Sequence, residues 1–99
     1  KLLYPLKDDE KIQEYYSRTI KKLEDYDEIN NSNLIKTLET YFRYNLRKSV
    51  VSEKLFIHVE TLRYRLNKIE EITGYSINDS EGLFALQMGV KLRSLLKLR

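Results

Sequence analysis

The chain has 99 residues, of which 33% are charged, with a net charge of +3 and no cysteine, and this length fits one small domain that buries its own core. Disulfides and thiolate metal ligands are therefore excluded, and with His58 as the single histidine we expect neither a metal site nor a cofactor. No apolar run approaches the roughly 18 residues of a membrane span and no signal-peptide pattern opens the chain, so we expect a cytoplasmic protein, cut from a longer one.

The positive charge is concentrated in one part of the sequence. Residues 1–42 hold seven Lys/Arg and nine Asp/Glu, residues 43–68 hold seven and two, and residues 69–99 hold four of each. A local excess of cationic side chains suits phosphate groups. A charged surface that meets only solvent is the alternative that charge alone leaves open.

Apolar residues at helical spacing, with almost no β-branched alternation, predict an all-α bundle of about five helices. A first helix is expected from about Asp8, where acidic residues favour the positive end of the helix dipole. Residues 24–33 are expected to form a polar connector, and Asn31 or Ser32 to cap a second helix that fades by residue 45. Residues 1–30 would thus pack as a helix and connector on a unit formed by residues 31–99.

The next two helices are expected to be separated by a tight turn. A short helix is predicted over residues 49–55, with Ser49 as its N-cap. A longer one should begin at Val59 and stop at Gly74, which is a favourable residue just beyond a helix end. After a loop, Asp79 or Ser80 should cap a last helix that reaches Leu98.

The helix predicted from Val59 is amphipathic. At about 100° per residue, one side collects four apolar residues: Val59, Leu62, Leu66 and Ile69. The opposite side collects polar residues: Glu60, Tyr64, Asn67 and Glu71. A short helix, a tight turn and an amphipathic helix together indicate a helix-turn-helix, whose second helix enters the major groove of DNA.

The residue types on this helix suggest which groups would meet DNA. Arginine reads guanine and glutamate accepts from cytosine, so we expect base contacts from Arg63, Asn67 and Glu60. Cationic, hydroxyl and helix-start groups suit phosphates; the expected phosphate contacts are Lys48, Ser49, Lys54, His58, Thr61, Tyr64, Arg65 and Lys68. Three alternatives remain open: a role at the helix dipole for Glu60, a capping or turn role for His58, and packing on a neighbouring helix for Tyr64. No catalytic group is predicted, because nothing in the sequence pairs with His58.

The last predicted helix is apolar on two nearly opposite sides. Such a helix is either central in the core or buried in an interface. Five residues of the second side would serve a homodimer: Phe84, Met88, Leu92, Leu95 and Leu96. A dimer would suit a protein that reads paired half-sites on DNA.

The segments "LIKTLETYF" and "SVVSEKLFIHVETLRYRLNKIEEITGYSIND" resemble the C-terminal helix-turn-helix domain of the PucR family, the purine-catabolism and sugar-diacid regulators. The resemblance covers about residues 26–96. The residues in register are Ile35, Thr37, Leu38, Tyr41, Leu55, His58, Thr61, Leu62, Tyr64, Arg65, Leu66, Ile69, Glu70, Thr73 and Gly74. Glu60 stands where the family usually has asparagine, and Ser52 where it usually has alanine.

This resemblance implies the DNA-binding end of a bacterial transcription regulator, preceded by a sensing region. The function expected is sequence-specific binding of double-stranded DNA without catalysis. The alternative is a helical protein-interaction or oligomerisation module that does not bind DNA.

Overall fold

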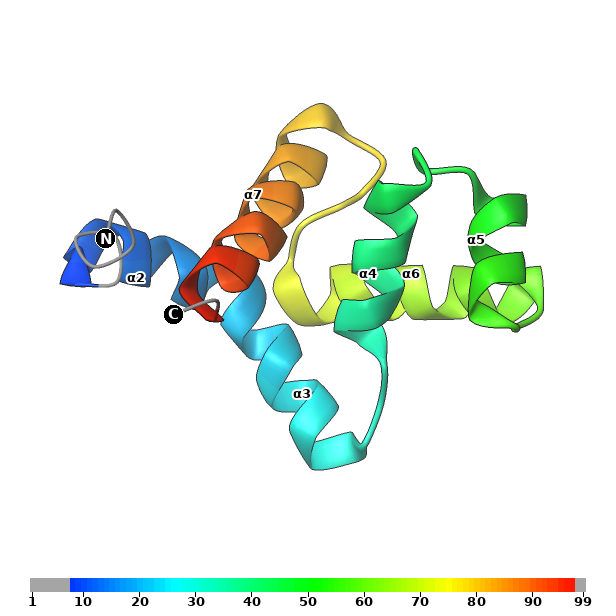
Figure 1. Cartoon of the computed structure of the whole chain (residues 1–99), viewed down its shortest axis with the longest axis horizontal. Coiled ribbons are helices and arrows are strands. Elements are labelled where there is room, and N and C mark those ends of the chain that lie inside the picture. Colours follow the sequence, from blue (N-terminus) through cyan, green and yellow to red (C-terminus); the bar gives the residue numbers. More distant parts are fainter. Residues whose placement is uncertain (1–7, 98–99) are drawn as a thin grey trace.

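The computed structural model describes residues 8–97, and every regular element in this range is helical. In chain order they are α2 (Glu10–Tyr16), the π-helical segment η1 (Ser17–Lys21), α3 (Lys22–Asn30), α4 (Leu34–Arg43), α5 (Lys48–Leu55), α6 (Val59–Thr73) and α7 (Ser80–Lys97). The first three are continuous, so residues 8–97 contain five separate helical rods (Figure 1). The predicted all-α class with about five helices is confirmed.

The first rod packs against α7 through its π-helical segment (Figure 1). It starts at Asp9, whose carboxylate accepts from the backbone N–H groups of Lys11 and Ile12. In η1 the side chains of Thr19 and Ile20 are fully buried. A Cβ added at Gly89 of α7 would lie only 2.4 Å from Ile20 Cγ1. The close approach of the two helices therefore depends on the missing side chain at Gly89.

The predicted polar connector is wrong over most of its length, because α3 continues to Asn30. The helix ends at Asn31, which has a left-handed backbone (φ 52°). Asp27 in the last turn of α3 accepts from Leu34 N and Ile35 N, both at 2.9 Å. Neither Asn31 nor Ser32 caps α4, because the acceptor for its first N–H groups comes from the preceding helix.

Helix α4 lies at the centre of the fold and packs against α3, α5, α6 and α7 (Figure 1). Its buried residues are Leu34, Ile35, Thr37, Leu38 and Tyr41. They join a single core with apolar residues from the other rods: Ile20, Leu23, Val51, Leu62, Leu66, Ile69, Leu86 and Val90. The core therefore fixes α6 directly on α4.

Helices α5 and α6 form the predicted helix-turn-helix. Helix α5 begins one residue earlier than expected and its N-cap is Arg47, not Ser49. The turn contains Phe56, which has a left-handed backbone (φ 58°) and a side chain that is 93% exposed. Helix α6 has the predicted bounds and ends at Gly74, whose φ of 81° explains why glycine stands there.

Ser52, at the contact between α5 and its neighbours, is buried. Its hydroxyl donates to the carbonyl oxygen of Ser49 at 3.0 Å. The buried hydroxyl of Ser52 therefore has a hydrogen-bond partner within its own helix, so its burial costs little free energy.

Helix α7 divides its apolar residues between the core and the surface. Asp79 accepts from Gly82 N at 2.7 Å, which confirms Asp79 as its cap; its predicted end at Leu98 lies outside the described residues. Leu86 and Val90 are in the core. Leu92 is also buried within the chain (7% exposed), so its predicted place in a dimer interface is wrong for this arrangement. The residues left exposed are Phe84, Met88 and Leu95, while Leu96 is partly buried.

Candidate nucleic-acid interface

The outward surface of α6 has two edges of different chemistry. Leu62, Leu66 and Ile69 point into the core. At about 100° per residue, one flank of the outward side carries Glu60, Arg63 and Asn67, and we call it the reading edge. Thr61, Arg65 and Lys68 lie on the other flank, and Tyr64 lies between the two flanks but lines the same cavity as these three. We call these four residues the cationic edge. The predicted base contacts and three of the predicted phosphate contacts thus separate onto different sides of one helix.

The reading edge is open to solvent. Arg63 Nη1 donates to Glu60 Oε2 at 2.7 Å, and both side chains are more than half exposed. Asn67 is exposed one turn further along. An exposed ion pair of this kind contributes only about 0–1 kcal/mol. Arg63 can therefore leave Glu60 for a better acceptor at little cost.

The cationic edge is held in place by neighbouring helices. Arg65 Nη1 donates to Thr37 Oγ1 at 3.1 Å, and Thr37 is fully buried in α4. This bond uses one of the five guanidinium N–H groups. Lys68 Nζ lies 3.4 Å from Glu71 Oε1 and 5.6 Å from the centre of the Tyr26 ring. The charge of Glu71 raises the pKa of Lys68, so Lys68 is protonated at neutral pH.

The cationic edge borders a cavity of about 260 Å³ between α6 and the loop that joins α3 to α4. The residues that line it are Tyr26, Asn31, Ser32, Asn33, Leu34, Thr61, Tyr64, Arg65 and Lys68. None of these lining residues is acidic. We call this cavity the α6–loop pocket. The loop residues were missed by sequence reasoning because they lie outside the helix-turn-helix and reach α6 only through the packing of α3 and α4.

The remaining predicted phosphate contacts lie on α5 and the turn. Lys48 Nζ lies 5.8 Å from the centre of the Tyr41 ring, and Lys54 Nζ lies 5.2 Å from that of Tyr44. Ser49 and His58 are exposed. His58 occupies the N-cap position of α6, but its side chain makes no capping hydrogen bond. Capping therefore does not explain why a histidine stands at this position.

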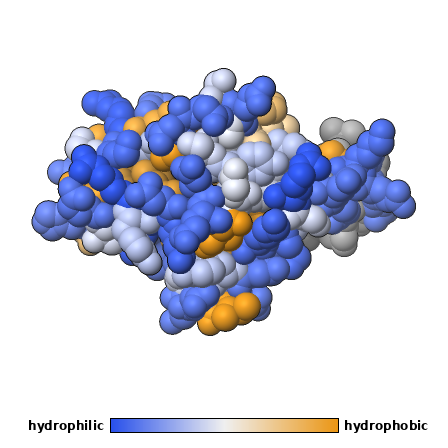
Figure 2. Space-filling model, turned by 180° about the vertical axis from the view of Figure 1, so that it is seen from behind, coloured by the Kyte–Doolittle hydropathy of each residue, from blue (hydrophilic) through white to orange (hydrophobic). Residues whose placement is uncertain are grey.

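Figure 2 shows the molecule from behind: its surface there is mostly hydrophilic, with hydrophobic groups in separate areas. A surface of this kind suits solvent or a polar partner better than a large apolar partner. The arrangement fits a helix that meets the polar edges of nucleic acid.

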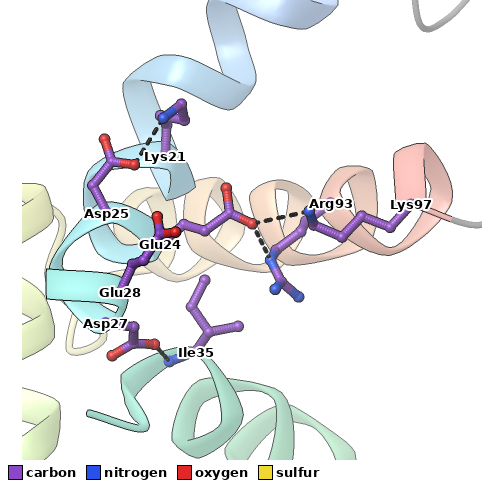
Figure 3. Close-up of a pocket in the computed structure, with 8 residues that line it drawn as sticks. All are labelled: Lys21, Glu24, Asp25, Asp27, Glu28, Ile35, Arg93 and Lys97. Atoms are coloured by element: carbon purple, nitrogen blue, oxygen red, sulfur yellow. Dashed lines mark hydrogen bonds and ion pairs between the residues drawn. The ribbon is translucent and has the colours of Figure 1, made fainter. Parts of the chain in front are cut away.

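A larger cavity, of about 430 Å³, has no residue of α6 in its lining (Figure 3). It is lined by Lys21, Glu24, Asp25, Asp27, Glu28, Ile35, Arg93 and Lys97. Glu24 accepts from Tyr16, from Arg93 Nε at 2.8 Å, and pairs with Lys97 Nζ at 3.4 Å. Burial alone would raise the pKa of Glu24, but these hydrogen bonds and the charge of Lys97 outweigh it and hold the pKa below its ordinary value.

The charges in this larger cavity are therefore largely paired with one another. Glu24 joins α3 to α7, and Asp27 points at the backbone nitrogen of Ile35 in α4 (Figure 3). Their role is to hold helices together. Sequence reasoning had assigned this stretch to a connector and so missed the network.

Over residues 8–97, no group of three or more His, Asp or Glu side chains is arranged to hold a metal ion. None of the helices in that range has the length and apolar character required to cross a membrane.

The family model for the PucR C-terminal helix-turn-helix domain matches residues 34–92. The chain is 34% identical over 79 residues to the DNA-binding transcriptional activator AdeR of Bacillus subtilis, covering 80% of this chain and 19% of that protein. It is 40% identical over 63 residues to the carbohydrate diacid regulator of Escherichia coli, covering 64% and 16%. It is 29% identical over 94 residues to the purine catabolism regulatory protein of Bacillus subtilis, covering 95% and 17%.

The match therefore spans less than a fifth of the length of each of these relatives. All three carry names of regulators, and none is named as an enzyme. No solved structure matches the chain.

Proposed function

The chain belongs to the family of PucR C-terminal helix-turn-helix domains, and from this premise we propose that it binds double-stranded DNA with sequence preference, as the DNA-reading part of a bacterial transcriptional regulator. The observation that carries the proposal is the outward surface of α6. It combines an exposed reading edge with a cationic edge on the second helix of a helix-turn-helix. The cytoplasm, where such a regulator meets DNA, is part of the same proposal.

In this proposal the reading edge contacts the bases and the cationic edge contacts the phosphates. Arg63 can bond guanine in the major groove, and Asn67 and Glu60 can bond adenine and cytosine. The cationic edge, with Lys48, Ser49, Lys54 and His58 on α5 and the turn, would contact phosphates and set the register of α6. Catalysis has no part in this proposal.

Replacing Arg63 by alanine should weaken binding about tenfold on a preferred DNA site and less on random DNA, because a base contact carries sequence information and a phosphate contact does not. Fluorescence anisotropy on a random-sequence duplex, and on a duplex obtained by selection, measured across a salt series, gives both values. Steep weakening of wild-type binding with rising salt is also expected.

Arg43→Ala is the matched control, because Arg43 is an exposed arginine of α4 that lines a cavity with residues of α7 and none of α6. It removes the same charge and should change binding by less than about threefold. Equal losses from both variants would show that only net charge matters and would reject Arg63 as a base contact. Absence of wild-type binding at low salt would reject the proposed function.

We also propose that the protein binds DNA as a homodimer. The observation behind this proposal is that α7 leaves Phe84 (63% exposed), Met88 and Leu95 on one exposed stripe, with Leu96 beside it. Symmetric dimers pair naturally with paired half-sites. Light scattering on the same samples gives the mass. A monomer, free and on DNA, would reject the dimer while leaving DNA binding intact.

The alternative function is an interaction module in which this stripe of α7 binds another protein and α6 binds nothing. An apolar interface should not weaken with salt as DNA binding does. The salt series above therefore separates the two functions.

A further inference from the structure

The α6–loop pocket is unusual for its charge. Two of its lining residues are cationic, six carry hydroxyl or amide groups, and none is acidic. The larger cavity beside α7 has four carboxylates in its lining. A cavity that offers donors and positive charge without a carboxylate suits an anion.

The cations of the pocket are already oriented. Arg65 is tied to buried Thr37, and Lys68 is held between Glu71 and the ring of Tyr26, with only 26% of its side chain exposed. Side chains fixed before binding lose less conformational freedom when a ligand arrives. The pocket therefore holds its charge in place without a ligand.

The loop contributes donors that its own fold does not use. Asp27 already satisfies the backbone N–H groups of Leu34 and Ile35. Within residues 8–97, the side-chain amides of Asn31 and Asn33 make no hydrogen bond, and both residues are exposed. Both asparagines line the pocket together with Thr61 and Tyr64, whose hydroxyls also make no hydrogen bond in this part of the chain.

We propose that the α6–loop pocket binds a backbone phosphate of the DNA duplex, so that residues 31–33 form a third DNA-contacting element besides α5 and α6. This inference rests on the proposed function. A helix in the major groove has a phosphate backbone on either side of it. With the reading edge toward the bases, the cationic edge and the loop face one backbone, where Arg65 and Lys68 neutralise the phosphate and the amides donate to its oxygens.

Asn33 gives the sharpest test, because it lies on the loop and outside the helix-turn-helix. Asn33→Asp puts a carboxylate in the pocket and should weaken binding to a random-sequence duplex about tenfold, whereas Asn33→Lys should strengthen it about threefold. Asn78→Asp and Asn78→Lys are the controls, since Asn78 is an exposed loop asparagine that does not line the pocket. They make the same changes in net charge and should shift binding by less than about twofold.

Circular dichroism and thermal unfolding establish that all four variants are folded. A loss of fold cannot give opposite changes in affinity at one position, so the opposed pair at Asn33 excludes a merely structural effect. Inorganic phosphate, titrated into the wild-type protein and followed by the amide resonances of residues 31–33, serves as the second probe. The same resonances are followed as the duplex is added. If they shift at a phosphate concentration at which free inorganic phosphate shifts none of them, the ligand is a phosphate of the DNA.

Equal effects at Asn33 and Asn78 would overturn the inference while DNA binding itself stands. Saturation of the pocket by inorganic phosphate alone, with no effect of the Asn33 variants on duplex binding, would also overturn it. If the wild-type protein does not bind the duplex at all, the proposed function fails and this inference fails with it.

Discussion

Gly89→Ala should lower the free energy of unfolding by about 2–3 kcal/mol, although alanine is the better helix former by about 1 kcal/mol. The reason is the approach of α7 to η1. A Cβ at position 89 would lie 2.4 Å from Ile20 Cγ1 and 2.6 Å from Thr19 Oγ1, and both residues are fully buried. The thermal midpoint should fall by roughly 10–20 °C for a domain of this size, which calorimetry or circular dichroism measures.

Ser94→Ala is the control, because Ser94 is an exposed residue of the same helix. Without a clash, alanine there should change stability by no more than about 0.5 kcal/mol. Ile20→Ala removes the atom nearest to the new methyl group. The double variant Gly89→Ala/Ile20→Ala should therefore lose less than the sum of the two single losses. Strict additivity, or a more stable Gly89→Ala protein, would contradict the contact.

Helix α6 could be predicted residue by residue because its signals are local. Its apolar spacing gives the buried face, and Gly74 adopts the backbone that ends the helix. The same holds for Asp79, which caps α7 from three residues away. At these two helix ends the residue and its partner lie within one short segment, so the sequence was sufficient there.

The region around α3 could not be predicted because its partners are distant. Polar residues from Glu24 onward indicate a connector when only neighbours are considered. In the structure Glu24 bonds Arg93, which lies 69 positions along the chain, and Asp27 bonds Ile35 in the next helix. These polar side chains thus bond to other helices. Helix α3 therefore continues where the sequence suggested a loop.

The candidate site was only partly predictable for the same reason. The helical spacing separates Arg63 from Arg65 on two sides of α6, but it does not show that Arg65 is tied to Thr37. Nor does it bring Asn31 and Asn33 to the cationic edge. Those facts depend on how α3 and α4 pack, which no local pattern encodes.

Asp27→Ala should lower the free energy of unfolding by about 2–3 kcal/mol, because one side chain serves three donors. Its carboxylate accepts from Leu34 N, Ile35 N and, at 2.6 Å, Ser32 Oγ. Alanine leaves the first N–H groups of α4 without an acceptor at the point where the chain turns from α3. Asp27→Asn keeps an oxygen acceptor but loses the charge that favours a helix start, so about half of the loss is expected.

Asp25→Ala separates this effect from the loss of a surface charge. Asp25 lies in the same helix and pairs only with exposed Lys21 in the described contacts, so its removal should cost no more than about 0.5 kcal/mol. Hydrogen exchange gives a second reading, because the amides of Leu34 and Ile35 should lose protection in Asp27→Ala and keep it in Asp25→Ala. Similar unfolding midpoints for the two alanine variants would mean that Asp27 does not cap α4. Since the loop held by Asp27 carries the amides of the α6–loop pocket, weaker DNA binding by folded Asp27→Ala would connect the cap to recognition.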